Sequence, residues 1–183
     1  DIKLYYIDYF DYFMNQKNSL GLDACFMDLD NPLELFKIWI SEAEKKEIND
    51  PNALSLATVD KNNNEPHVRI ILLKDYSEKG FIFYTNLNSP KSHDIKKNPK
   101  GEMCFHWKSL QRQIRIFGSM VQVSDKEADI YFNSRPYESR IGAWASDQSK
   151  IMSKREDFLE KINEFKNKYK DMNNVPRPKN WSG

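Results

Sequence analysis

The chain has 183 residues, of which 39% are hydrophobic and 13% aromatic, so it can bury a sizeable core. It carries 28 Lys and Arg against 27 Asp and Glu, and this balance argues against a general attraction to nucleic acid or to an anionic membrane. No apolar run approaches the roughly 18 residues of a membrane span. The two cysteines, Cys25 and Cys104, are too few for a disulfide framework, and we therefore expect a reduced, cytoplasmic setting.

The first part of the chain predicts an arm followed by a helix. Residues 1–28 show no steady hydrophobic period and are interpreted as a partly ordered arm, which precedes one domain over residues 29–183. Asn31, Pro32 and Glu34 are typical of a helix start, and helical spacing of apolar residues predicts a helix to about residue 46. The predicted apolar face consists of Leu35, Phe36, Trp39, Ile40 and Ala43.

Runs rich in β-branched and aromatic residues predict five strands in the middle of the chain. They cover residues 53–59, 68–74, 81–85, 103–107 and 113–123. Gly118 interrupts the last run and predicts a bulge. A short helix from Ser89-Pro90 to Asn98-Pro99 separates the third strand from the fourth. Consecutive strands with short turns favour an antiparallel meander closed into a barrel.

Two capping boxes, each a Ser followed three residues later by Glu, predict two later helices. The box at Ser124 opens a helix to about Arg135, and the box at Ser153 opens a longer one. The apolar face of the longer helix is expected to contain Phe158, Leu159, Ile162, Phe165 and Tyr169. The Pro-x-Pro run before Trp181 predicts an extended segment whose Trp packs on a neighbouring surface.

Two basic residues, Arg69 and Lys74, flank an apolar strand and form the first candidate site. They are either strand ends that reach water or an anion site. Because the two positions differ in strand parity, their side chains cannot point at one atom from a regular strand.

A second candidate site consists of Tyr131, Arg135 and Ser139, spaced four apart so that a helix would place them on one face. Two hydroxyls and a guanidinium suit phosphate oxygens, and a polar surface helix is the alternative. Pro136 is expected to break the helix, which would leave Arg135 and Ser139 at its end. Gln148-Ser149 can bond a phosphate or a ring carbonyl, or cap a turn.

Other functional motifs are absent from the sequence. No Gly-rich run fits a nucleotide-phosphate loop, and His67, His93 and His106 lack metal-ligand spacing. Cys104 lies in an apolar strand and is expected in the core. We therefore predict neither a metal nor a nucleic-acid partner.

Taken in order, several runs over residues 31–183 resemble the pyridoxamine 5′-phosphate oxidase family. The most specific block joins Ser134-Arg135-Pro136 to Gln148-Ser149 and to the terminal Pro-x-Pro and Trp181. The other matching runs are Asn31-Pro32-Leu33, Arg69-Ile70-Ile71-Leu72-Leu73-Lys74, Phe83-Tyr84-Thr85-Asn86-Leu87, Arg112-Gln113 and Ser139-Arg140-Ile141-Gly142-Ala143-Trp144.

The resemblance implies an α+β, mainly β, FMN-binding split β-barrel with flanking helices. It implies a homodimer with FMN at the interface and oxidation of pyridoxamine or pyridoxine 5′-phosphate to pyridoxal 5′-phosphate by O₂. By position, FMN would be held by Arg69, Ile70, Leu73, Lys74, Tyr84, Thr85, Lys91, Gln113, Gln148, Ser149 and Trp181. The substrate phosphate would be held by Lys74, Tyr131, Arg135 and Ser139.

The chain departs from the family pattern in three places. Pro90 precedes Lys91 where the family has an Arg-Lys pair, and the N-terminal arm lacks the family's lid motif. The family also continues past the Trp to an Arg and a His that contact substrate. Both would lie beyond Gly183, so no catalytic residue is assigned within the chain.

The missing segment leaves several readings open. We expect a shortened chain or a degenerate paralogue with little oxidase activity. The alternatives are a non-catalytic split barrel that binds flavin or pyridoxal phosphate, and a relative with another substrate.

Overall fold

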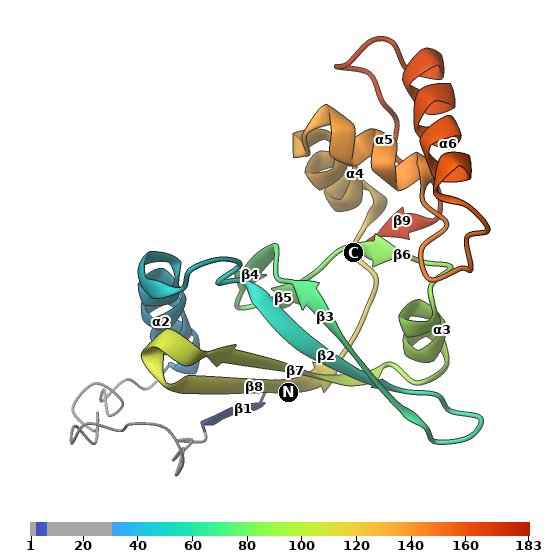
Figure 1. Cartoon of the computed structure of the whole chain (residues 1–183). Coiled ribbons are helices and arrows are strands. Elements are labelled where there is room, and N and C mark those ends of the chain that lie inside the picture. Colours follow the sequence, from blue (N-terminus) through green and yellow to red (C-terminus); the bar gives the residue numbers. More distant parts are fainter. Residues whose placement is uncertain (1–2, 7–30) are drawn as a thin grey trace. The chain divides into compact units, whose positions relative to one another are not determined.

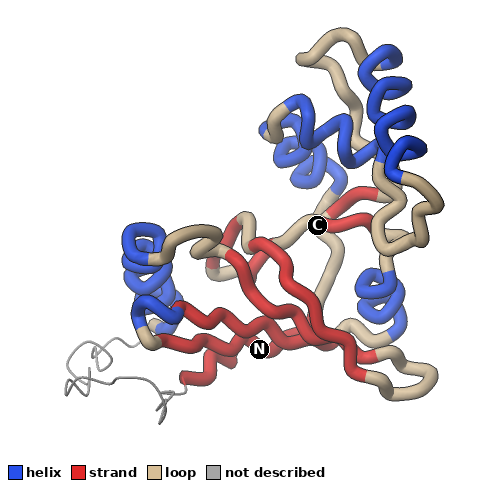
Figure 2. The backbone as a smooth tube through the Cα atoms, viewed as in Figure 1, coloured by secondary structure: helices blue, strands red, loops and turns tan. Residues whose placement is uncertain are grey.

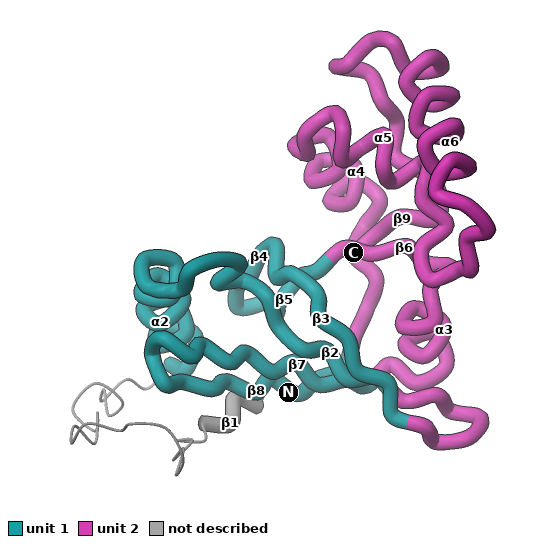
Figure 3. Tube along the Cα trace, viewed as in Figure 1, with its two compact units in different colours: residues 1–58, 66–83, 100–119 teal, residues 59–65, 84–99, 120–183 magenta. Residues whose placement is uncertain are grey.

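The computed structural model describes residues 3–6 and 31–183 (Figure 1). These residues form two compact units (Figure 3). The first unit takes the described parts of residues 1–58, 66–83 and 100–119, and the second takes residues 59–65, 84–99 and 120–183. Of the predicted arm, residues 1–2 and 7–28 lie outside the described residues. The prediction of one domain over residues 29–183 stays a prediction.

The first unit is built on a five-stranded sheet with the strand order β1-β8-β7-β2-β3 (Figure 2). Its strands are β1 (Lys3–Tyr6), β2 (Ala53–Val59), β3 (Pro66–Leu72), β7 (Lys100–Trp107) and β8 (Arg112–Ser119). The β7–β8 register is unbroken from Lys100 opposite Ser119 to Trp107 opposite Arg112. Gly118 therefore lies in a regular ladder, and the predicted bulge is wrong. The strand β1, within the predicted arm, was not expected from the sequence.

The helix α2 (Pro32–Lys46) supplies the core of the first unit. Its cap is the one the sequence predicts, because the Asn31 side chain accepts a hydrogen bond from the Leu33 amide at 2.9 Å. Its buried residues are Leu33, Phe36, Trp39, Ile40 and Ala43. Leu33 thus takes the place predicted for Leu35, which is only half-buried. Phe36 meets the rings of Phe81 and Phe105 at centroid distances of 5.0 and 5.5 Å.

The prediction of one continuous strand at residues 81–85 is wrong. Its first part forms β5 (Gly80–Ile82), which pairs with β4 (Asp75–Ser77) in a hairpin. Its last residue begins β6 (Thr85–Asn86), which pairs in a separate sheet with β9 (Trp181–Ser182).

The extended segment predicted around Trp181 is confirmed, and the Trp181 side chain is buried. The residue after β9, Gly183, also makes a backbone contact within the second unit. Its carbonyl accepts a hydrogen bond from the Val123 amide at 3.0 Å. The segment that carries Trp181 is therefore held by β6 on one side and by the chain before α4 (Asp125–Ser134) at its last residue.

Four helices belong to the second unit: α3 (Pro90–Lys97), α4, α5 (Tyr137–Ala145) and α6 (Arg155–Lys168). Phe132, Ile141, Val175 and Trp181 form its core, against which Ile162, Phe165 and Tyr169 pack. Pro136 ends α4 as predicted, but a further helix, α5, starts immediately after it.

The two predicted capping boxes differ in outcome. The box at Ser124 is present at the start of α4. The box at Ser153 is absent, because α6 begins one residue later and its cap residue, Lys154, makes no side-chain capping bond. Leu159, predicted on the apolar face of this helix, is exposed. None of the helices in the described ranges is long and apolar enough to cross a membrane.

Candidate functional site

The first group of predicted site residues surrounds the ammonium of Lys91, which lies at the start of α3 and is only 7% exposed. Its Nζ atom donates to Thr85 Oγ1 and Ser89 Oγ, both at 3.1 Å, and to Gln148 Oε1 at 3.4 Å. We call Thr85, Ser89, Lys91 and Gln148 the Lys91 cluster. A buried cation among hydroxyls and an amide suits an anion with several oxygen atoms.

Local structure explains how these four residues meet. Ser89 and Pro90 begin α3, with Pro at the first helical position, so that Lys91 lies in the first turn. Gln148 follows α5 and reaches β6, where its Oε1 accepts from Thr85 Oγ1 and from the Asn86 amide, both at 3.2 Å. The second unit alone therefore assembles the cluster. Sequence reasoning missed Ser89, although its place before Pro90 marks it as a helix cap.

The second group is a stack of three aromatic rings from different parts of the second unit. Tyr84 lies 4.0 Å from Tyr131 and 5.1 Å from Trp181 between ring centroids, with interplanar angles of 11° and 8°. Tyr131 and Trp181 are 6.1 Å apart and also parallel. Parallel rings at these distances are stacked on one another, and all three side chains are buried or half-buried. We call these three residues the aromatic stack.

Arg135 lies against the aromatic stack. Its Cζ atom is 4.8 Å from the centroid of the Trp181 ring. Its Nη1 atom is buried and has no hydrogen-bond partner among the described residues. Burial lowers the pKa of Arg135, and burial also raises the pKa of Tyr131. A half-buried guanidinium with an unused, buried donor is suited to an anionic ligand.

The predicted helical face of Tyr131, Arg135 and Ser139 is wrong, because two helices share these residues. Tyr131 lies in α4, Arg135 is the residue that ends α4, and Ser139 lies in α5. The expectation that Ser139 would follow Arg135 at the end of one helix is therefore also wrong. Tyr131 and Arg135 are nevertheless close together, since the charge of Arg135 lowers the pKa of Tyr131 against the larger, opposite effect of burial.

The remaining predicted flavin residues lie in the first unit, apart from Ser149 after Gln148. Arg69 on β3 donates to the Leu56 carbonyl at 3.1 Å and to Thr58 Oγ1 at 2.7 Å. Ile70 is exposed, whereas Leu73 is buried and its backbone bonds to Asn52. The strand ends at Leu72, so Lys74 lies outside it and the parity argument no longer relates Lys74 to Arg69. Gln113 lies on β8, opposite His106.

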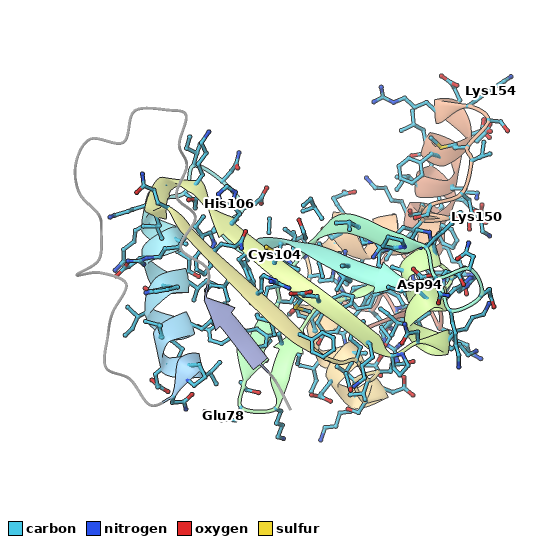
Figure 4. The ribbon with its side chains drawn as sticks, turned by 90° about the horizontal axis from the view of Figure 1, so that it is seen from below. Glu78, Asp94, Cys104, His106, Lys150 and Lys154 are labelled. Carbon is cyan, nitrogen blue, oxygen red and sulfur yellow. The ribbon has the colours of Figure 1, made fainter. Side chains whose placement is uncertain are left out.

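The described residues give no support to metal or thiol chemistry. In these ranges, His, Cys, Asp and Glu form no group of three or more that could hold a metal ion. Cys104 and His106 both lie on β7 (Figure 4). Cys104 is half-buried, and burial raises the pKa of its thiol, which favours the protonated form.

Comparison with known proteins extends this description. Residues 40–169 match the family model described as pyridoxamine 5′-phosphate oxidase. The chain is 59% identical over 170 residues to the pyridoxine/pyridoxamine 5′-phosphate oxidase of Pelagibacter ubique, covering 93% of this chain and 81% of the relative. It is 50% identical over 166 residues to the enzyme of the same name from Bartonella henselae, covering 91% and 79%.

Both relatives are longer than the part of them that this chain matches. The sequence resemblance implies a family segment beyond Gly183, and this segment stays a prediction. The catalytic Arg and His expected in that segment stay a prediction. Gly183 itself is assigned no functional role, since its described contact is the backbone hydrogen bond with Val123.

Solved structures with low sequence identity share the fold. PhzG from Burkholderia lata, in complex with tetrahydrophenazine-1-carboxylic acid, has a TM-score of 0.78 at 24% identity, over 90% of this chain and 78% of that one. A pyridoxamine 5′-phosphate oxidase-related, FMN-binding protein from Nostoc punctiforme has a TM-score of 0.65 at 17% identity, covering 85% and 80%.

The fold is thus the split barrel of FMN-binding flavoproteins, with both helices and strands, as the sequence predicts. The sequence comparisons also identify the family within this fold class. The chain belongs to the pyridoxamine 5′-phosphate oxidase family, and the resemblance noted in its sequence is confirmed.

Proposed function

We propose that the chain oxidises pyridoxamine 5′-phosphate and pyridoxine 5′-phosphate to pyridoxal 5′-phosphate, with FMN as cofactor and O₂ as electron acceptor. For pyridoxamine phosphate, O₂ and water are consumed while ammonia and hydrogen peroxide are released, so atoms and electrons balance. The observation that carries the proposal is the buried, unpartnered Nη1 of Arg135 beside the aromatic stack. It suits a ligand that combines a phosphate with an aromatic ring.

The residues of the second unit fit FMN. The Lys91 cluster offers one cation and two hydroxyls to the cofactor phosphate. When bound, FMN would supply an acceptor for the hydride that leaves the C4′ carbon of the substrate, and a route for the electrons to O₂. We assign Tyr84, Thr85, Lys91, Gln148, Ser149 and Trp181 to the cofactor, together with Arg69, Ile70, Leu73, Lys74 and Gln113 of the first unit.

Arg135 and Tyr131 bind the substrate phosphate in this proposal, and the family resemblance adds Lys74 and Ser139. Arg135 donates from Nη1, and the ring of Trp181 beneath it fixes the plane of the guanidinium. Holding the phosphate at a fixed point orients the rest of a small rigid substrate. This orientation lowers the barrier by removing freedom that the reactants would otherwise lose on the way to the transition state.

The test is anaerobic reduction of the flavin by substrate. The purified chain is saturated with FMN, oxygen is removed, and pyridoxamine 5′-phosphate is added while the flavin absorbance is followed. We expect the oxidised spectrum to bleach slowly, in line with the low activity expected from the sequence, and pyridoxal phosphate to form in equal amount. Pyridoxamine without its phosphate is the control and should bleach the flavin far more slowly. Bound flavin that stays oxidised with the phosphorylated substrate would contradict the proposal and favour a binding protein.

A homodimer with FMN at its interface is the finer part of this proposal. In the first unit, β3 is an edge strand, and Val68, Ile70 and Leu72 project from one of its faces with exposed fractions of 65%, 66% and 37%. Such an apolar edge is a typical contact between subunits. A cytoplasmic location is also proposed, and it rests on the cysteine content alone.

The dimer is tested by light scattering coupled to gel filtration. We expect the wild-type mass to be twice that of the chain and Ile70→Lys to shift it toward the monomer. Ile48→Lys is the matched control, because Ile48 is exposed outside β3. A monomeric wild-type chain that binds FMN tightly would overturn the dimer but leave the reaction in place.

A further inference from the structure

Ser182 carries a polar group that the fold leaves unused. Its side chain is fully buried, with 0% exposure. Its Oγ atom has no hydrogen-bond partner among the described residues. A buried hydroxyl without a partner lowers stability, so its presence calls for a ligand that is bound in the working protein.

The pairing of β6 with β9 determines which way Ser182 faces. The strands β6 and β9 lie side by side (Figure 1). Thr85 is directly opposite Ser182, and Asn86 is opposite Trp181. Directly opposed residues of an antiparallel pair have their side chains on the same face of the ladder. Ser182 therefore shares a face with Thr85, whose Oγ1 atom is 3.1 Å from Lys91 Nζ. The unused hydroxyl lies on the side of the Lys91 cluster.

The opposite face of the same ladder is the one used by Arg135. Side chains alternate along a strand, so Trp181 points away from the Ser182 side. Trp181 stacks on Tyr84 and lies under the Arg135 guanidinium. The two-residue ladder thus separates two cationic groups: Lys91 with Ser182 on one face, and Arg135 with Trp181 on the other. Ser182 therefore lies on the Lys91 side of the ladder and not on the Arg135 side.

We propose that the Ser182 hydroxyl donates a hydrogen bond to the phosphate of bound FMN and acts as a further ligand of the Lys91 cluster. This assignment rests on the proposed function. Lys91 Nζ donates to Thr85, Ser89 and Gln148, so its ammonium is already directed into the cluster. Pro90 leaves this site without the second cation of the family pattern, and an additional hydroxyl donor offsets part of that loss.

The test compares FMN with riboflavin, which has the same ring system but no phosphate. Flavin-free protein is titrated with each flavin, and binding is followed by the quenching of flavin fluorescence. We expect Ser182→Ala to weaken FMN about tenfold and to leave riboflavin unchanged. Ser182→Cys, similar in size but a weaker donor, should fall between wild type and alanine. Ser119→Ala, at an exposed position on β8, should change neither affinity.

A second measurement separates a ligand from a structural residue. The melting temperature of the flavin-free Ser182→Ala protein should equal or exceed that of wild type, because the substitution removes a hydroxyl that has no partner. A lower melting temperature, or equal weakening of both flavins, would show a structural role and overturn the assignment. Unchanged FMN affinity would overturn it while leaving the proposed function standing. A wild-type chain that binds no FMN would overturn both.

Discussion

The Arg135 guanidinium lies on the ring of Trp181, 4.8 Å from Cζ to ring centroid, and so joins the end of α4 to the last strand of the chain. These residues are far apart in sequence, but their side chains are in contact in the fold. Trp181 covers one face of the guanidinium, and the buried Nη1 atom has no hydrogen-bond partner among the described residues. The charge of Arg135 is thereby fixed in direction before any substrate arrives.

Arg135→Ala should raise KM for pyridoxamine 5′-phosphate and leave the bound flavin spectrum unchanged. One hydrogen bond between charged groups is worth about 1.5–3 kcal/mol, which corresponds to roughly ten- to hundredfold in binding. Arg135→Lys should recover only part of this loss, because an ammonium cannot stack on Trp181 and donate in the same geometry. The measurement is a steady-state titration of substrate together with the flavin content of each variant.

Arg155→Ala is the matched control, since Arg155 is an exposed arginine at the start of α6. It should leave KM unchanged. If Arg135→Ala lost FMN and substrate binding in equal measure, the assignment of this arginine to the substrate phosphate would be wrong.

Arg177 fastens the segment that carries Trp181. Its guanidinium donates to Asp129 at 2.6 Å, to Asp125 at 2.8 Å and to the Trp181 carbonyl at 2.7 Å. Its side chain is only 10% exposed. Arg177→Ala should therefore destabilise the protein by about 2 kcal/mol and lower Tm by about 4–8 °C, measured by thermal unfolding. Lys166→Ala, which breaks an exposed pair with Glu138, should cost less than about 1 kcal/mol. Equal effects of the two variants would contradict the anchoring role of Arg177.

Asp147, next to Gln148, provides a prediction about pH. The hydrogen bond from Lys161, at 2.8 Å, and the charge of that lysine hold the pKa of Asp147 below its ordinary value. A carboxyl with a lowered folded-state pKa stabilises the fold above its unfolded pKa of about 3.9 and loses that contribution as pH falls through the folded value. Lys161→Met should raise the pKa of Asp147 toward the ordinary range, as followed by NMR titration. Lys166→Met should leave it in place, and the same shift in both variants would argue against the specific pair.

Local patterns in the sequence predicted the elements that local interactions define. The cap at Asn31 and the apolar spacing after it are properties of neighbouring residues, and α2 forms as expected. The strands β1, β6 and β9 are different, since they contain four, two and two residues and exist only through pairing with distant partners. No local period reveals such strands, and a single run at residues 81–85 was predicted where the structure divides it.

The sequence identified individual residues of the candidate site but not which of them lie close together. Thr85, Lys91 and Gln148 were each named from the family resemblance, and their meeting depends on how α3, β6 and the segment after α5 fold together. The helical spacing of Tyr131, Arg135 and Ser139 suggested one face, but Pro136 starts a new helix between them. No sequence pattern identified Ser182 as a candidate site residue, because its proposed role depends on its burial and on the residue opposite it in the sheet.

The two capping boxes provide the last prediction, since identical sequence patterns gave different structures. Ser124 Oγ accepts from the Glu127 amide at 3.2 Å, and the Glu127 carboxylate accepts from the Ser124 amide at 3.2 Å. Ser124→Ala should therefore destabilise the protein by about 1 kcal/mol, measured by urea unfolding. Ser153 precedes the actual cap, Lys154, so Ser153→Ala should change stability by less than about 0.5 kcal/mol. A comparable loss in both variants would mean that the second box forms in solution, and that α6 starts one residue earlier than described.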